Sequence, residues 1–191
     1  MSLVLPFVCL FSVVRAHAQI QAQPSWAVVP FVNKSSGGGN YGPIASQAIY
    51  EELSKLGKYD LRPPDEVNRT ITTLGLQTPV TDDTSLLRLS NELRVSTIVT
   101  GEVVGWGVQS VAGGKQAEVG IRVLVRDVAS GLGINGAAID AKSSVRSANT
   151  PVETLVSEAI DQASAQAVAT IQSQVLPNAT ILNTRNNVGD V

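Results

Sequence analysis

The stretch VVPFVNKSSGGGNYGPIASQAIYEEL, residues 28–53, has the pattern of a strand, a glycine-rich loop and a helix. The apolar run that ends before Asn33 is typical of a buried strand. Pro43 is expected at the first helical position, where its missing N–H has no intrahelical acceptor to lose. The helix is expected to run to about residue 56 and to end at Gly57. This unit predicts an α/β fold.

The loop in this unit contains Gly37, Gly39 and Gly42, which fit the spacing G-x-G-x-x-G of a dinucleotide-binding turn. In that motif the first glycine makes the turn at the end of the strand, but here residues 33–36 intervene. Pro43 also removes one of the N–H groups that a pyrophosphate would use. The pattern therefore favours a surface connection, with nucleotide binding and binding of another small anion as the alternatives.

The remainder of the chain predicts further helices and then an antiparallel meander. Helical spacing is found before Gly75 and again in a third helix, for which either Asp82 or Asp83 can act as the cap. Three strands are expected over 97–108, 117–128 and 134–145, joined by glycine-containing turns. The second of these strands alternates, with its apolar side chains on one face: Val119, Ile121, Val123 and Val125.

A capping box at residues 150–153 opens the last predicted helix, which is expected to run to about residue 175. The predicted order is β-α-β-α-α-β-β-β-α. It describes a mixed α/β sandwich in which helices cover one or both faces of a sheet that ends in an antiparallel meander.

The beginning of the sequence predicts export. Residues 1–14 are mostly apolar, and Ala16-His17-Ala18 fits the cleavage pattern of a secretory signal peptide, which we place at 1–18. A linker is expected at 19–25 and a globular domain at 26–175. Residues 176–191 are interpreted as a tail or as the start of a further β unit. Lipid attachment at Cys9 is the less favoured alternative, because the residues before it are not small.

Removal of residues 1–18 would take with it the single histidine, cysteine and methionine of the chain. The remaining chain cannot build a Ser-His or Cys-His nucleophile, or a thiolate or imidazole metal site. The charge is nearly balanced, with a net charge of −2, and contains no basic run of the kind that binds nucleic acid. General acid–base chemistry would have to use carboxylates, lysine or tyrosine. We expect no metal or cofactor, and the expectation that the protein is not an enzyme comes from the family resemblance described next.

Three stretches, taken in their order along the chain, resemble the pattern of a known family. An apolar strand ends in Pro30-Phe31 and is followed by Asn33 and Ser35; residues 93–103 (LRVSTIVTGEV) lead from a helix into a strand; residues 122–131 (RVLVRDVASG) form a strand and turn. Over residues 26–175 the chain resembles the CsgG-like superfamily of bacterial envelope domains, which includes the curli secretion protein CsgG, LpoB and the amino-terminal domain of TolB.

The resemblance implies a non-catalytic protein-binding or assembly module of the cell envelope, in the periplasm or at the periplasmic face of the outer membrane. Its partners would be envelope proteins, and it allows peripheral membrane association and oligomerisation. One alternative is a subunit of a CsgG-type secretion channel, although the chain has no room for two membrane hairpins; another is a nucleotide-binding enzyme that uses residues 37–42. The expected partner-binding loop comprises Asn33, Ser35, Ser36, Gly37, Gly39, Tyr41 and Trp106.

Overall fold

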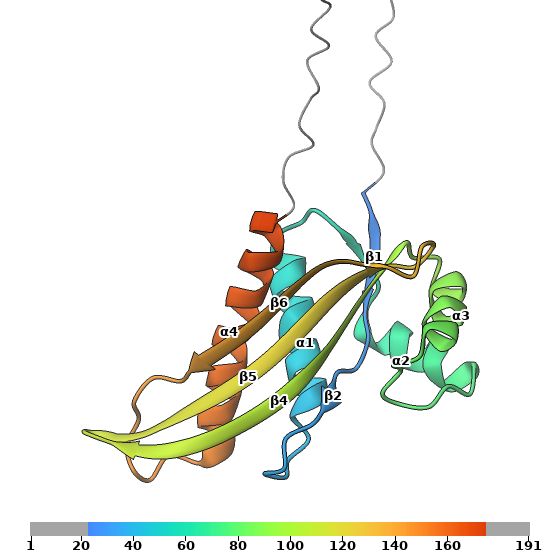
Figure 1. Ribbon diagram of the computed structural model, residues 1–191. Coiled ribbons are helices and arrows are strands. Elements are labelled where there is room, and N and C mark those ends of the chain that lie inside the picture. Colours follow the sequence, from blue (N-terminus) through green and yellow to red (C-terminus); the bar gives the residue numbers. More distant parts are fainter. Residues whose placement is uncertain (1–22, 175–191) are drawn as a thin grey trace, which may run out of the picture.

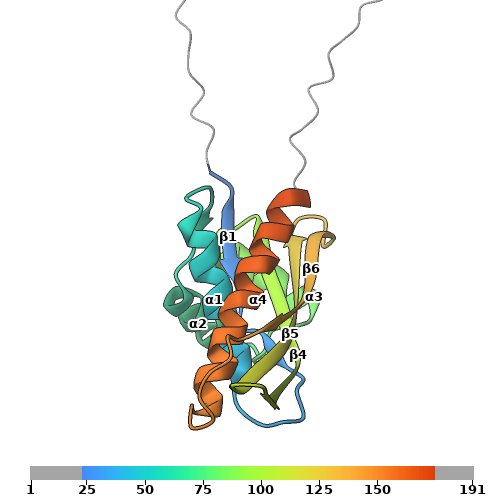
Figure 2. The ribbon, with the colours of Figure 1, turned by 90° about the vertical axis from the view of Figure 1, so that its left-hand side faces the viewer.

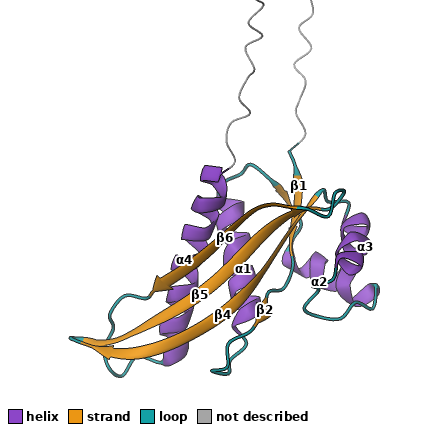
Figure 3. Cartoon of the chain, in the orientation of Figure 1, coloured by secondary structure: helices purple, strands orange, loops and turns teal. Residues whose placement is uncertain are grey.

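The computed structural model describes residues 23–174, a mixed α/β domain in which helices pack on a single mixed sheet (Figures 1 and 3). The predicted order of elements is confirmed, except that the first strand is divided in two. The predicted signal peptide and the carboxy-terminal tail lie outside the described residues. The elements are β1 (Ser25–Val28), β2 (Val32–Asn33), α1 (Tyr41–Lys55), β3 (Asp60–Leu61), α2 (Pro64–Thr73), α3 (Asp83–Leu93), β4 (Thr97–Val111), β5 (Gly114–Asp127), β6 (Gly133–Lys142) and α4 (Val152–Gln174).

The first strand is divided at Pro30. The N–H of Val29 still donates to the carbonyl of Val99 at 3.1 Å, and pairing with β4 resumes at β2. Pro30 lies between these two points and has no N–H with which to continue the ladder. The division therefore follows from the covalent chemistry of one residue.

Helix α1 begins at Tyr41, two residues before the start expected from Pro43. That prediction was wrong in its position but not in its physical reason. The third helical position still belongs to the first turn, where N–H groups have no acceptor within the helix. Proline is therefore tolerated there as well.

The sheet has the strand order β3-β1-β4-β5-β6, and β2 pairs with β4. Strand β1 runs parallel to β3 and β4, whereas β4, β5 and β6 form an antiparallel meander. The apolar side of β5 is buried as predicted, and α1 and α4 cover that face (Figure 2). Fully buried alanines such as Ala159, Ala163 and Ala167 let α4 lie close to its neighbours.

The opposite face of the sheet is only partly covered. Helices α2 and α3 pack over β1 and the first residues of β4, where Ala27, Val29 and Ile98 are buried. Beyond Ile98, β4, β5 and β6 carry no helix of the described chain on this side (Figure 1). We call this surface the open face, and its central residues are Thr100, Glu102, Arg122, Leu124, Gly136 and Ala138.

None of the helices within residues 23–174 combines the length and the apolar character that a membrane span requires.

Candidate functional site

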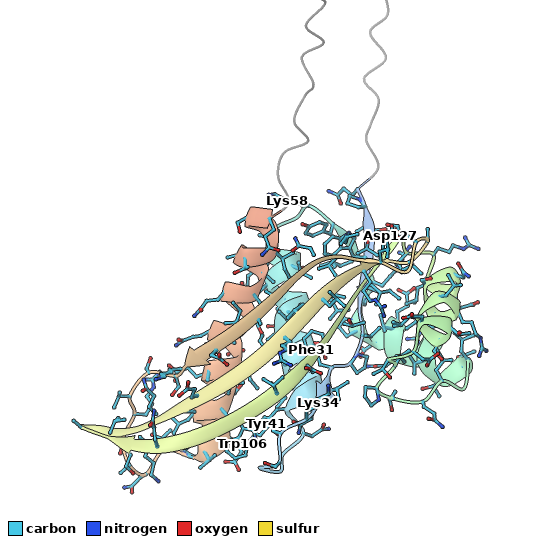
Figure 4. All side chains as sticks on the ribbon, viewed as in Figure 1. Phe31, Lys34, Tyr41, Lys58, Trp106 and Asp127 are labelled. Atoms are coloured by element: carbon cyan, nitrogen blue, oxygen red, sulfur yellow. The ribbon has the colours of Figure 1, made fainter. Side chains whose placement is uncertain are left out.

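The glycine-rich loop folds back against the protein. The indole N–H of Trp106 donates to the carbonyl of Gly38 at 3.2 Å. The rings of Tyr41 and Trp106 meet edge to face, with centroids 5.3 Å apart (Figure 4). The side-chain amide of Asn33 donates to the carbonyl of Gly39 at 2.6 Å. The loop is thus held by an aromatic pair and by an asparagine at its base.

The glycines of the fingerprint have packing reasons. A Cβ on Gly37 would lie 3.0 Å from the Trp106 ring, and one on Gly39 would lie 2.3 Å from the ring of Tyr41. A Cβ on Gly42 would lie 2.2 Å from the carbonyl oxygen of Phe31. The space beside each glycine is therefore occupied by the protein's own atoms, which supports the interpretation as a surface connection rather than a phosphate cradle.

The structure brings most of the predicted partner-binding residues together at the loop. The contacts just described involve Asn33, Gly37, Gly39, Tyr41 and Trp106, whereas Ser35 and Ser36 lie beside them on the loop. Tyr41 is buried, and burial, followed by the charge of a nearby glutamate, raises the pKa of its phenol. The hydroxyl of Ser35 donates to the side-chain oxygen of Asn33 at 2.6 Å, and Ser36 is exposed on the loop. The cluster can hold the loop in one shape, and its role in partner binding stays a prediction.

A groove of about 610 Å³ lies on the open face, between β4–β6 and the loop that precedes α3. Its floor is low because the residues that face it there, Gly136 and Ala138, are small. Leu124 stands in this floor with 40% of its surface exposed. Further lining residues are Val29, Pro30, Val32, Val80, Thr81, Thr100 and Val123.

Charged side chains form the rim of the groove. Arg122 Nη1 lies 3.2 Å from one carboxylate oxygen of Glu102, and Lys34 pairs with the other oxygen. The hydrogen bond from Lys34 is the main cause that lowers the pKa of the Glu102 carboxyl, and burial opposes it. Arg126 pairs with Asp83, the first residue of α3, at 2.7 Å. A partner bound in the groove would therefore contact an apolar floor that is flanked by ion pairs.

The open face continues toward the β4–β5 hairpin. A second hollow of about 400 Å³ lies there, lined by residues of the same three strands. Its floor contains Gly105 and Gly120, which face each other across β4 and β5. The two hollows together give the open face a long, shallow surface.

Sequence reasoning missed this groove. The alternation of β5 places Leu124 between Arg122 and Arg126, on the face that the pattern predicts to be polar. A leucine at such a position is the only signal that the sequence offers for the groove, and single exposed leucines are common on protein surfaces.

No family model and no curated protein matches this chain. Among solved structures, the LpoB C-terminal domain from Salmonella enterica superposes with a TM-score of 0.50 at 14% identity, over 64% of this chain and 85% of that domain. The chain has an LpoB-like fold.

Two further solved structures agree with this LpoB-like fold. Lipoprotein GNA1162 from Neisseria meningitidis matches with a TM-score of 0.50 at 21% identity, over 73% of this chain and 96% of that chain. The solution structure of E. coli LpoB matches with a TM-score of 0.50 at 15% identity, over 62% of this chain and 57% of that one. At these identities the likeness establishes the fold alone.

Within the described residues, no histidine, cysteine, aspartate or glutamate side chains gather in a group that could hold a metal ion. The chemistry that the open-face groove offers is that of docking: apolar contact on its floor and ion pairing at its rim.

Proposed function

We propose that this protein is a non-catalytic protein-binding module of the bacterial cell envelope, and that it docks a partner protein on the open-face groove. The observation that carries this proposal is the half-covered sheet. Helices α1 and α4 bury the apolar side of β5 on one face, but α2 and α3 cover only the part of the other face near β1. An antiparallel meander can leave one face in water, but an apolar hollow with a charged rim on that face is typical of an interaction surface.

The composition of the groove supports a protein partner. Protein interfaces combine an apolar centre with a polar rim. Leu124 and the small residues beside it supply the centre, and the Glu102–Arg122 and Arg126–Asp83 pairs supply the rim. The small residues would let a partner backbone approach the sheet closely.

An envelope location is supported by the predicted signal peptide at 1–18 and by analogy with folds of the same kind, one of which is named as a lipoprotein. Membership of the CsgG-like superfamily, through the stretches quoted above, belongs to the same proposal. The loss of the only histidine and cysteine with the signal peptide supports a role without catalysis.

A site-specific photocrosslinking experiment tests the proposal. A photoreactive amino acid at position 124 of the exported, tagged protein should capture one defined envelope protein. The same amino acid at position 58, an exposed site far from the groove (Figure 4), should not capture it. Leu124→Arg should abolish the interaction, and Leu124→Met should preserve it.

Crosslinks from position 58 but not from position 124 would refute docking on the groove. Capture of the protein only by itself, in large rings, would favour the alternative of a secretion-channel subunit. Equal thermal stability of the Leu124 variants would show that any loss of binding is not a loss of folding.

A further inference from the structure

Strand β6 forms one edge of the sheet, and within the described residues it has a neighbour only on the β5 side. The N–H of Ser143, which directly follows β6, donates to the carbonyl of Ala117 at 2.9 Å. In an antiparallel ladder both main-chain groups of a residue point the same way, and successive residues alternate. The main-chain groups of Ala138, Asp140 and Lys142 therefore point away from β5, along the free edge.

Side chains cap this edge at both ends. Asn135 Oδ1 accepts the N–H of Gly136 at 2.7 Å, and a carboxylate oxygen of Glu158 accepts the N–H of Ser144 at 3.1 Å. Between these caps, the outward main-chain groups of Ala138, Asp140 and Lys142 have no hydrogen-bond partner among residues 23–174, and the side chains of these three residues are exposed. We call this stretch the β6 window. An edge with an uncapped stretch is a template for a further strand.

The handedness of the fold argues against filling this window with a strand that follows α4 and runs parallel to β6. Helices α1 and α4 lie on the same face of the sheet, and β6 runs parallel to β1. The crossover from β1 through α1 to β3 moves toward one edge of the sheet. A crossover from β6 through α4 to a strand beside β6 would move toward the other edge and would have the opposite hand. Crossovers of both hands in one sheet conflict with the strong preference for right-handed connections.

A second copy is also a poor occupant. The antiparallel register that pairs the β6 windows of two copies completely sets Ala138 opposite Lys142 and Asp140 opposite Asp140. Like charges directly opposite each other on neighbouring strands are destabilising. The edge therefore discriminates against pairing with itself.

We propose that the β6 window accepts an extended segment of a different protein as an additional antiparallel strand. This inference rests on the proposed function and specifies how the partner is held. Antiparallel pairing requires an acidic residue opposite Lys142, then an apolar residue, then a basic residue opposite Asp140. The apolar residue between them would lie on the α4 side, next to Ile139 and Ala141. Because Gly136 and Ala138 also line the groove, the added strand would form a new wall of it.

Selection of random phage-displayed peptides on the purified protein tests this proposal. The selected peptides should share the order acidic, apolar, basic. Ala138→Pro removes one outward N–H and leaves the β5–β6 ladder intact, because proline is tolerated at a free edge. We expect it to weaken the selected peptides about tenfold or more, since a main-chain hydrogen bond is lost and a carbonyl is left unpaired. The matched control Ala138→Ser retains the N–H and should bind like the unmodified protein.

A charge exchange supplies a second test that does not depend on proline. In the double variant Asp140→Lys, Lys142→Asp, selection should return peptides with the opposite order, basic, apolar, acidic. Failure to select any peptide, or equal binding to the unmodified protein and Ala138→Pro, would overturn strand addition. Peptides that lose binding to Leu124→Arg but not to Ala138→Pro would also overturn it and leave docking on the groove standing, so the two proposals fail separately.

Discussion

Replacing Gly42 with alanine tests why the glycine-rich loop contains its last glycine. The added Cβ would lie 2.2 Å from the carbonyl oxygen of Phe31 and 3.1 Å from its carbonyl carbon. The obstacle is backbone at the break between β1 and β2 rather than the end of a flexible side chain, so strands or helix must shift. Overpacking of this kind costs about 1–3 kcal/mol.

Alanine also improves helix propensity by up to about 1 kcal/mol, because Gly42 lies in the first turn of α1. Because the 2.2 Å contact is with backbone, the overpacking cost belongs to the upper part of its range, about 2–3 kcal/mol, and a propensity gain of about 1 kcal/mol leaves a net loss in the free energy of unfolding of roughly 1–2 kcal/mol. For a domain of this size each kcal/mol lowers the Tm by about 2–4 °C, which gives a decrease of roughly 2–8 °C. Thermal unfolding followed by circular dichroism measures this directly.

Gly107→Ala is the matched control. Gly107 lies in β4, and a Cβ there would meet nothing within 4 Å. This variant should be neutral or stabilised by up to about 1 kcal/mol, because alanine restricts the unfolded chain. Equal Tm values for Gly42→Ala and Gly107→Ala would refute the packing explanation and return the glycine spacing to the nucleotide-binding alternative.

Other substitutions follow from the same contacts. Trp106→Ala should cost about 1–3 kcal/mol, through loss of the edge-to-face contact with Tyr41 and of the bond to the loop, and should speed proteolysis of residues 34–40. Ile160→Ala, in the fully buried face of α4, should cost about 2–5 kcal/mol in urea unfolding. Burial and neighbouring glutamates raise the pKa of the Asp161 carboxyl, so the fold disfavours its charged form. Asp161→Asn should therefore raise the urea midpoint at pH 7. It should not raise it at a pH below the folded pKa, where Asp161 is already neutral. The pKa of the Glu102 carboxyl is lowered in the fold, so the ion pairs of its charged form stabilise the protein fully above pH 4.5, the ordinary pKa. This stabilisation is lost as the pH falls through the folded pKa. Glu102→Gln should therefore lower the urea midpoint at pH 7 and leave it unchanged at a pH where Glu102 is protonated.

The open-face groove shows which features of the site were beyond sequence reasoning. Glu102 and Arg122 are paired only because β4 and β5 meet in a particular register. Trp106 covers the loop at Gly38 although the two are 68 residues apart in the chain. Neither contact produces a local sequence pattern. The first depends on the register of the β4–β5 hairpin, and the second depends on how the loop before α1 folds against β4.

The sequence by itself determined the order of the elements and the buried side of the meander. Helical and strand periodicities are local, so the alternation of Val119 to Val125 and the capping box before α4 were sufficient to predict them. The tertiary structure alone decided which part of the second sheet face α2 and α3 cover. The position of the open-face groove and the free edge of β6 follow from that packing and from the strand order. Packing and strand order each depend on many weak contacts between segments that are distant in the sequence, so no local pattern predicts them.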